Sequence, residues 1–527
     1  MTRVLGIEGT AWAASAAVYD SSSDALRMDS VAYQPDSGGI HPREAAEHMH
    51  DAIPRVIEAV LADTDDSLDA VAFSRGPGLG PCLRTVGTAA RALAGTLDLP
   101  LVGVNHMVAH LAIGRHESGF TSPVCLNASG ANAHLLGFHD GRYRVLGETM
   151  DTGVGNAIDK FARSAGWDHP GGPKVEEAAR DGEYVDLPYV VKGMDFSFAG
   201  ITSAAQEALE DGTPVEDVCR GLQETVFGML TEVSERALSL TGSDELVLGG
   251  GVGQNRRLQG MLDSMCGARG AAFHAPADRF LRDNAGMIAV LGARMYEAGA
   301  TIPIEDSAVR PDFRPDEVPV TWRSGESVTR PPAEASEIRG AEAVVEVDGD
   351  ARKRRVPKAY RHPALDDRLR RERTAMEARL TSFARRHGVP TPVLRDVDPG
   401  EATLVFERVG TADLGAALTE PRVRAVGEHL AALHAAGVVH GDPTTRNARV
   451  DPDAGRVSLI DFGLGYHTED VEDYAMDLHV FEQSVAGTAA DHEPLCRAFE
   501  DAYREAGDPA VLDRLREIEG RGRYQGE

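Results

Sequence analysis

Two histidines one helical turn apart, His106 and His110, are the clearest candidates for chemistry in the first half of this sequence. They follow the strand-like run LVGVN and open a helical stretch, so the i, i+4 spacing places both imidazoles on one helix face. Two such rings can bind one divalent ion, although the pair alone is equally compatible with surface or capping histidines. Met107 occupies the position where a metalloprotease of this pattern carries its glutamate base, which argues against peptide hydrolysis.

Asp283 is the best candidate for a third ligand. It lies in the polar turn RDNAGM before a predicted helix. Two imidazoles and a carboxylate suit Zn or Fe(II) and leave positions open for a substrate oxygen or water. The alternative for Asp283 is a helix N-cap.

Glycine-rich turns accompany these ligands. The run GGGVGQN at 249–255 follows the apolar strand ELVL and precedes a helix, so backbone N–H groups and a helix N-terminus can face a phosphate there. Three further glycine turns, at 6–10, 127–132 and 171–179, indicate a cleft between two lobes. Asp159 and Glu176 are candidates for binding ribose hydroxyls or substrate amines, although surface carboxylates are common in so acidic a chain.

The second half carries a different set of reactive residues. His440-Gly-Asp442 and Asn447 precede an apolar strand and then Asp461-Phe-Gly463, which is the order typical of phosphoryl-transfer enzymes. Asp442 is expected to orient the nucleophile or accept its proton. Asn447 and Asp461 are expected to coordinate Mg²⁺.

Residues upstream complete this second site. Lys353 is the predicted phosphate-binding lysine, paired with Glu377, and Lys358 is the competing lysine. The glycine loop is reduced, which leaves few backbone amides for ATP. The candidate ATP-binding residues are Ile338, Gly340, Ala341, Glu342, Ala343 and Lys353. The stretch after Gly463 is too short for a peptide-binding lobe, so an ATPase or a very restricted kinase is expected.

The elements that must position these residues divide the chain into two domains. Residues 1 to about 300 alternate apolar runs with glycine turns and amphipathic segments, which indicates an α/β architecture. Strands are expected at 3–7, 70–74, 102–104, 124–128 and 245–248, and helices at 42–61, 83–97, 214–240 and 284–298. We assign 1–323 to the first domain, 306–336 to a proline-rich linker region, and 337–527 to an α+β domain with a hairpin and helices at 363–387 and 423–436.

Composition restricts where the chain works. The net charge is −29, with 83 Asp and Glu against 54 Lys and Arg, and an excess of acid with so little Lys predicts a salt-rich cytoplasm and salt-dependent stability. The five cysteines are scattered and predict no zinc knuckle or redox pair. No signal peptide or membrane span is expected, so the chain is predicted to be soluble and cytoplasmic.

One segment is basic against this background. Residues 352–373 hold ten Lys and Arg against three acids. This segment is a candidate contact for a polyanion such as tRNA, and the equally weighted alternative is that its cations serve ATP and pairing on the helix surface.

The ordered motifs of the first domain closely resemble the universal tRNA threonylcarbamoyltransferase family, whose archaeal and eukaryotic members belong to the KEOPS complex. The motifs are GIEGTA, HPREAAEHMH, RGPGLGPCLRTVG, VNHMVAH, NAIDKFAR, GGPKVEEAA, FSFAGI, GGGVGQN and RDNAGMIA. The resemblance implies a two-lobed actin/hexokinase-like ATPase fold. It also implies transfer of threonylcarbamoyl from threonylcarbamoyl-adenylate to the exocyclic amine of adenosine 37, in tRNAs that read codons beginning with A.

The same resemblance assigns residues. His106, His110 and Asp283 match the family's metal ligands, and the positions that hold the adenylate match Asn127, Ala128, Ser129, Gly130, Ala131, Asp159, Gly172, Glu176 and Asn255. Two departures stand out, because Asn127 replaces a usual Tyr and Trp12 replaces a frequent His. No general base is identified.

The second domain resembles the small KEOPS-associated atypical kinase, through HGDPTTRN, DFGLGYHTEDVEDYAMDL and RVPKAYRHPALDDRLRRERT. The resemblance implies a protein-kinase-like fold that uses ATP and Mg²⁺, and partners that include tRNA, a small dimerising subunit and a kinase-binding subunit. Alternatives are a metalloprotease fused to a regulatory protein kinase, or a carbohydrate kinase or chaperone-like ATPase. The last two would not need His106 and His110.

Overall fold

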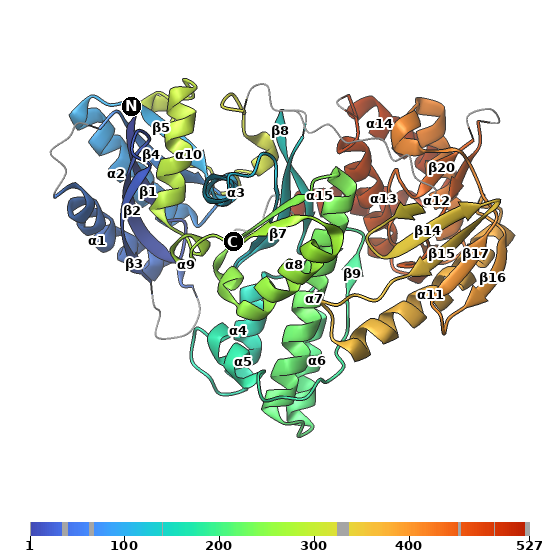
Figure 1. The fold of residues 1–527 in the computed structure, drawn as a ribbon. Coiled ribbons are helices and arrows are strands. Elements are labelled where there is room, and N and C mark those ends of the chain that lie inside the picture. The colour runs from blue at the N-terminus through green and yellow to red at the C-terminus, as the bar shows by residue number, and fades with distance from the viewer. Residues whose placement is uncertain are drawn as a thin grey trace.

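The computed structural model describes residues 2–33, 40–62, 68–139, 141–323, 337–451, 455–489 and 491–521. Figure 1 shows three bodies side by side, with a blue lobe, a teal and green lobe, and an orange and red unit. We call residues 2–323 the first unit and residues 337–521 the second unit.

The first lobe is built on a five-stranded mixed sheet of order β3-β2-β1-β4-β5. Its strands are β1 (Arg3–Glu8), β2 (Ala13–Asp20), β3 (Ala25–Ala32), β4 (Ala70–Gly76) and β5 (Leu101–Asn105). The pairs β1–β4 and β4–β5 are parallel, and β2 is antiparallel to both of its neighbours. Along β1, Leu5 and Ile7 pack with α1 (Pro42–Leu61) and α2 (Gly80–Leu97), whereas Val4 packs with α10 (Ala285–Glu297) on the other face.

The second lobe repeats this plan with a sheet of order β12-β11-β6-β7-β8. Its strands are β6 (Val124–Ala128), β7 (Ala133–His139), β8 (Arg142–Glu148), β11 (Glu245–Gly249) and β12 (Ala272–His274). The helices are α4 (Val154–Ser164), α5 (Gly172–Ala178), α6 (Ala199–Glu210), α7 (Val215–Thr241), α8 (Arg256–Arg269) and α9 (Asp278–Leu281), with the turn η1 (Gly251–Gln254) and the hairpin β9 (Val191–Lys192) and β10 (Asp195–Phe196).

Helices α3 (His106–Ser118) and α10 join the lobes, because their buried side chains share one apolar cluster with residues from both sheets. Gly6 of β1 allows the close approach of α10, since a Cβ there would lie 2.6 Å from the backbone oxygen of Ala285. The N-termini of α3 and α10 thereby meet between the lobes.

The first part of the predicted linker region 306–336 is a packed strap rather than a free connection. Residues 304–323 include the turns η2 (Ile304–Asp306) and η3 (Pro315–Glu317), and Phe313 and Val318 are buried against the first unit. Asn105 donates a hydrogen bond from Nδ2 to the Phe313 oxygen at 2.8 Å. The proline-rich pattern lacks a helical or strand period because these residues follow the surface of the lobe. Residues 324–336 lie outside the described residues.

The second unit has a small antiparallel sheet and a helical part. The sheet, of order β13-β14-β15-β17-β16, is covered by α11 (Pro363–Arg386). Its strands are β13 (Glu337–Arg339), β14 (Ala343–Asp348), β15 (Asp350–Arg355), β16 (Leu394–Asp398) and β17 (Thr403–Phe406). The helical part holds α12 (Glu420–Ala435), α13 (Val471–Ala486), α14 (Glu493–Ala506), α15 (Pro509–Arg521), η4 (Leu414–Ala417), β18 (Ala412–Asp413), β19 (Val438–Val439), β20 (Ala448–Val450), β21 (Val457–Leu459) and β22 (Tyr466–His467).

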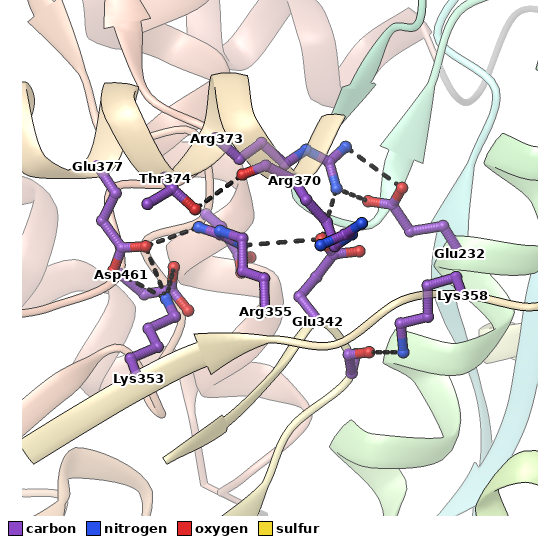
Figure 2. A network of polar contacts seen from close by, with 12 residues as sticks. Glu232, Glu342, Lys353, Arg355, Lys358, Arg370, Arg373, Thr374, Glu377 and Asp461 are labelled. Atoms are coloured by element: carbon purple, nitrogen blue, oxygen red, sulfur yellow. Dashed lines mark hydrogen bonds and ion pairs between the residues drawn. The ribbon is translucent and has the colours of Figure 1, made fainter. Parts of the chain in front are cut away.

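Buried ion pairs join the two units (Figure 2). Glu232 of α7 meets Arg361 at 2.6 Å and Arg373 at 3.1 Å, and Glu235 meets Lys358 at 2.6 Å. The side chain of Glu232 is fully buried, so its charge is withdrawn from water and is satisfied by protein groups, which include Arg236 and the Tyr189 hydroxyl as well.

This network corrects the interpretation of the basic segment 352–373. Its cations Lys353, Arg355, Arg361 and Arg373 are buried, and Arg368, Arg370 and Arg371 pair with neighbouring acids. Only Arg352, Arg354 and Arg371 of the ten basic residues count as exposed. The local charge excess is therefore compensated largely by acids that are distant in sequence, and it does not form a continuous surface for a polyanion.

Among the described helices, none combines the length and the apolar character that crossing a bilayer requires.

Candidate functional site

The three predicted metal ligands converge where α3 and α10 begin. Strand β5 ends at Asn105, whose Oδ1 caps α3 by accepting hydrogen bonds from the backbone N–H groups of Met107 and Val108. His106 Nε2 lies 3.3 Å and His110 Nε2 3.6 Å from Asp283 Oδ1. Asp283 is not the cap of α10, because Asn284 takes that role through its Oδ1. The N-cap alternative for Asp283 is therefore wrong, and its carboxylate is free to face the imidazoles.

Glu8, at the end of β1, completes the electrostatics of this cluster. Its Oε2 lies 3.1 Å from His106 Nδ1, and its Oε1 accepts a hydrogen bond from the Thr10 backbone N–H at 2.8 Å. Burial would lower the pKa of His106, but the facing carboxylates of Glu8 and Asp283 raise it to about 10. The buried carboxylate of Glu8 and the partly exposed one of Asp283 therefore favour positive charge at this point.

The donor set fits a divalent ion. One ligand atom from each of His106, His110 and Asp283 lies within 4.8 Å of the others. Within the part of the chain that the structure describes, both ring nitrogens of His110 are buried without a hydrogen-bond partner. Burial lowers its pKa despite the nearby Asp283, which favours the neutral ring that a ligand must present. Two imidazole nitrogens and one carboxylate are the donors of Zn and Fe(II) sites with open positions.

These ligands border a cleft of about 1050 Å³ between the lobes. Most of the predicted substrate residues line it: Asn127, Ser129, Gly130, Ala131, Asp159, Gly172, Glu176 and Asn255, together with His106 and Asp283. Ala128 does not line it, because its side chain is buried in the apolar core behind β6. His110 lies beneath the cleft wall, with its side chain 1% exposed.

The cleft carboxylates and amide are held by local hydrogen bonds. Asp159 accepts the Gly171 N–H at 2.7 Å, and Glu176 accepts the N–H of Arg256 at the start of α8. Asn255 caps the same helix. Each side chain therefore has a fixed position before any ligand binds.

The structure also places residues at the cleft that local patterns did not indicate. Glu8 and His134 lie beside the metal ligands, and burial lowers the pKa of His134 to about 3. His169 stacks on Trp12, with ring centroids 5.1 Å apart. In the sequence, Glu8, His134 and His169 could have been noticed only because they lie inside or next to the glycine motifs.

A second group of reactive residues meets in the second unit. Lys353 Nζ lies 2.8 Å from Glu377 Oε1 and 2.6 Å from Asp461 Oδ1 (Figure 2), and Asn447 Nδ2 donates to Asp442 Oδ2 at 3.0 Å. The competing Lys358 instead pairs with Glu235 across the interface. Burial raises the pKa of Asp442 to about 7, against the lowering effect of Arg236. Although burial opposes it, Lys353 and Arg355 hold the pKa of Asp461 below its usual value.

The predicted ATP-binding loop contributes less than expected. The Glu342 carboxylate is occupied by Arg361 at 3.0 Å and Arg373 at 2.7 Å, so it belongs to the interface network rather than to an open nucleotide site. The Ala341 oxygen accepts a hydrogen bond from Lys358, and Ala343 is buried in β14. Gly340 is exposed between β13 and β14. The side chain of Ile338 lies outside the described residues.

The first unit reaches this second site through the β9–β10 hairpin and α7. Gly193 donates its N–H to the Gly441 oxygen at 2.8 Å, and Lys192 pairs with Asp473 at 2.5 Å. Arg236 Nη1 donates to the Gly193 oxygen at 3.0 Å and lies 3.9 Å from Asp442 Oδ2. The loop around Asp442 is therefore in direct contact with the first unit.

Comparison with known proteins covers both units. The model of the tRNA N6-adenosine threonylcarbamoyltransferase family matches residues 26–290. The chain is 71% identical over 527 residues to a probable bifunctional tRNA threonylcarbamoyladenosine biosynthesis protein of Halobacterium salinarum, covering 99% of each. Proteins with the same description are 71% identical in Natronomonas pharaonis (100% of each covered) and 52% identical in Methanospirillum hungatei (99% of each covered).

Proposed function

Since the chain belongs to the family of bifunctional tRNA threonylcarbamoyladenosine biosynthesis proteins, we propose that its first unit transfers threonylcarbamoyl from threonylcarbamoyl-adenylate to the exocyclic amine of adenosine 37 in tRNAs that read codons beginning with A. The observation that carries this proposal is the convergence of His106, His110 and Asp283 beside a cleft that residues of the glycine turns also line. The mixed α/β architecture of two similar lobes supports an actin/hexokinase-like fold.

Each residue of the triad has a defined part in this reaction. Glu8 accepts a hydrogen bond from His106 Nδ1, which fixes the tautomer that leaves Nε2 facing Asp283. His110 presents an unbonded nitrogen from below. A Zn or Fe(II) ion held by these ligands supplies Lewis acidity that polarises the acyl carbonyl or the phosphate.

The remaining cleft residues bind and orient the adenylate. Residues of the turns at 129–131 and 251–255 line the cleft, and backbone N–H groups there are the candidates to hold its phosphate, with the start of α8 adding partial positive charge. Glu176 and Asp159 are placed to accept hydrogen bonds from ribose hydroxyls or the threonyl amine. Asn127 stands where related enzymes carry Tyr, and its Oδ1 is buried and unbonded beside the metal ligands.

The second unit is proposed to be an atypical protein-kinase-like domain that hydrolyses ATP or phosphorylates restricted targets in support of the transfer. Asp442 orients the attacking oxygen, Lys353 contacts the nucleotide phosphates while Glu377 holds it in place, and Asn447 and Asp461 are placed to bind Mg²⁺. The contact of Arg236 and Gly193 with the Asp442 loop leaves little room for a protein substrate, which favours the ATPase reading.

The proposed partners are tRNA and other KEOPS subunits, a small dimerising subunit and a kinase-binding subunit, in the cytoplasm. The metalloprotease alternative has no support, since Met107 is buried where the base would stand and the relatives are described as tRNA-modification proteins.

Reconstitution separates the two activities. The full chain is combined with the adenylate-forming enzyme, threonine, bicarbonate, ATP, tRNA and the other subunits, and modified adenosine and released phosphate are measured. His106→Ala should abolish modification while ATP turnover continues, and Asp442→Ala should abolish ATP turnover and impair repeated cycles of modification. His50→Ala, on the exposed face of α1, is the matched control. Full modification by His106→Ala would contradict the proposal.

A further inference from the structure

Trp12 spans the cleft from one lobe to the other. It lies in the loop between β1 and β2 of the first lobe, and its ring stacks on His169 of the second lobe with an interplanar angle of 13°. Tyr33 is the next ring, tilted by 35° with its centroid 6.4 Å from that of Trp12. All three line the cleft, so its wall carries a short row of aromatic rings.

The indole lies between two parts of the cleft, the loop that carries Glu8 and the turn at Gly130. Thr10, two residues earlier, donates its N–H to Glu8, which holds His106. On the far side, the indole Nε1 lies 3.4 Å from where a Cβ on Gly130 would be, against the predicted phosphate turn. The ring therefore borders both the loop that carries Glu8 and the predicted phosphate turn.

His169 is anchored from its own side by Asp159, whose Oδ2 lies 3.2 Å from His169 Nδ1. Among the described residues, none accepts a hydrogen bond from the indole Nε1. A flat ring with an open donor at its edge matches a nucleobase, which offers both a π-face and ring acceptors.

We propose that Trp12 is a stacking platform for the acceptor adenine of tRNA, and that this base replaces His169 on the indole face during transfer. The inference rests on the proposed function and adds the binding site of its second substrate. The residues proposed to hold the adenylate belong to the second lobe, whereas Trp12 belongs to the first lobe and borders that site at Gly130, so a base on the indole would lie next to the adenylate.

Intrinsic fluorescence tests the contact without requiring turnover. Trp12, Trp167 and Trp322 are the three tryptophans, and Trp167→Phe with Trp322→Phe leaves Trp12 as the single reporter in the full chain. An anticodon stem-loop RNA with adenosine at position 37 should quench its emission in a saturable way. The same RNA with an abasic site at 37 should not, and AMP should not. Equal quenching by the abasic RNA, or quenching by AMP only, would overturn the proposal.

Kinetics in the reconstituted system give a second reading. Because stacking of a base on an aromatic ring strengthens binding roughly 5- to 150-fold, Trp12→Ala should raise the KM for tRNA by a factor in that range, with the KM for the adenylate unchanged. Trp12→Phe, which keeps a flat ring, should recover most of the loss. A rise in the adenylate KM alone would refute the assignment. Failure of the wild-type chain to transfer at all would refute the proposed function instead. The fluorescence experiment would still show whether the base at position 37 stacks on Trp12.

Discussion

Glu8 is not one of the three predicted metal ligands. It contacts the ring of His106, and through that ring it affects metal binding. Because Glu8 Oε2 faces His106 Nδ1, replacing the carboxylate with an amide places an N–H group or a weaker acceptor against that nitrogen. We expect Glu8→Gln to weaken metal binding roughly 10- to 100-fold, the usual effect of losing such a partner. Titration of Zn²⁺ against a competing chelator measures it.

Glu47→Gln, which changes an exposed carboxylate of α1, is the matched control for Glu8→Gln. Equal metal affinity in the two variants would show that Glu8 does not orient His106.

Asp195 provides a pH-dependent contribution to stability at the hairpin that contacts the second unit. It is buried, its Oδ1 accepts the Glu148 N–H at 2.8 Å, and burial raises its pKa from 3.8 to about 7. Between these values the folded chain holds a proton that the unfolded chain has lost, so this group's contribution to stability falls as pH rises from about 4 to 7. The slope is at most about 1.4 kcal/mol per pH unit.

Asp195→Asn should remove that slope. The free energy of unfolding is measured in urea at constant salt for both proteins. The value for the variant minus the value for the wild type should increase as the pH rises from 4 to 7 and should stay constant above pH 7. A difference between the two proteins that does not change with pH would contradict a buried, neutral Asp195.

The regular elements were predicted best where one strong local pattern decides them. The helix expected at 42–61 is α1 to the residue, because it is amphipathic and begins at a proline. The strands expected at 3–7, 70–74 and 124–128 are likewise present. Strands β2, β3, β7 and β8 were not predicted, since runs such as AASAAVYD are rich in alanine and their pairing in hairpins, rather than their propensity, makes them strands.

The site was predictable only where its residues are neighbours in sequence. The spacing of His106 and His110 placed two imidazoles together, but Asp283 joins them through the packing of α10 on α3. Its polar turn made it a candidate that suited a helix N-cap as well, and the family resemblance decided for a ligand. The basic segment failed for the same reason, because Glu232 and Glu235 lie more than a hundred residues from the arginines and lysine that they neutralise.

Helix α7 carries the buried acids that bind the second unit to the first. Glu232 and Arg361 are both nearly free of solvent, at 0% and 1% exposure, so removing the carboxylate takes one of the two acids that Arg361 and Arg373 share and leaves Glu342 as the other. Breaking such a pair costs about 3–5 kcal/mol. We expect Glu232→Ala to separate the single unfolding transition of the chain into two, with the second unit released first in guanidinium titration.

The comparison for Glu232→Ala is Glu372→Ala, which removes a carboxylate that is 60% exposed and pairs with Arg368 on α11. An exposed pair of this kind contributes little, so this variant should unfold like the wild type. If both variants unfold alike, the ion-pair network does not hold the units together.

The β9–β10 hairpin lies between the two reactive centres of the molecule and contacts residues next to both. The β9–β10 hairpin contacts the Asp442 loop through Gly193 and the cleft strand β8 through Asp195. Of the five lysines, Lys192 and Lys358 lie in ion pairs between the units, and Lys353 lies at the second centre. Three of the five lysines therefore form ion pairs, two of them between the units and one within the second reactive centre.

The remaining acid excess lies on the surface, and it makes the whole fold dependent on salt. With a net charge of −29, exposed carboxylates repel one another over the Debye length, which falls from about 10 Å at 0.1 M to about 3 Å at 1 M salt. Burying the ion pairs between the units does not relieve this repulsion, because they are neutral as a group and screened little by salt. The melting temperature should therefore rise with KCl. Asp51→Asn with Glu58→Gln, on the exposed face of α1, should raise it at 0.1 M and lose that advantage at 1 M. A melting temperature that stays flat with KCl, or a variant whose advantage persists at high salt, would show that packing rather than screened repulsion sets the stability of this acidic chain.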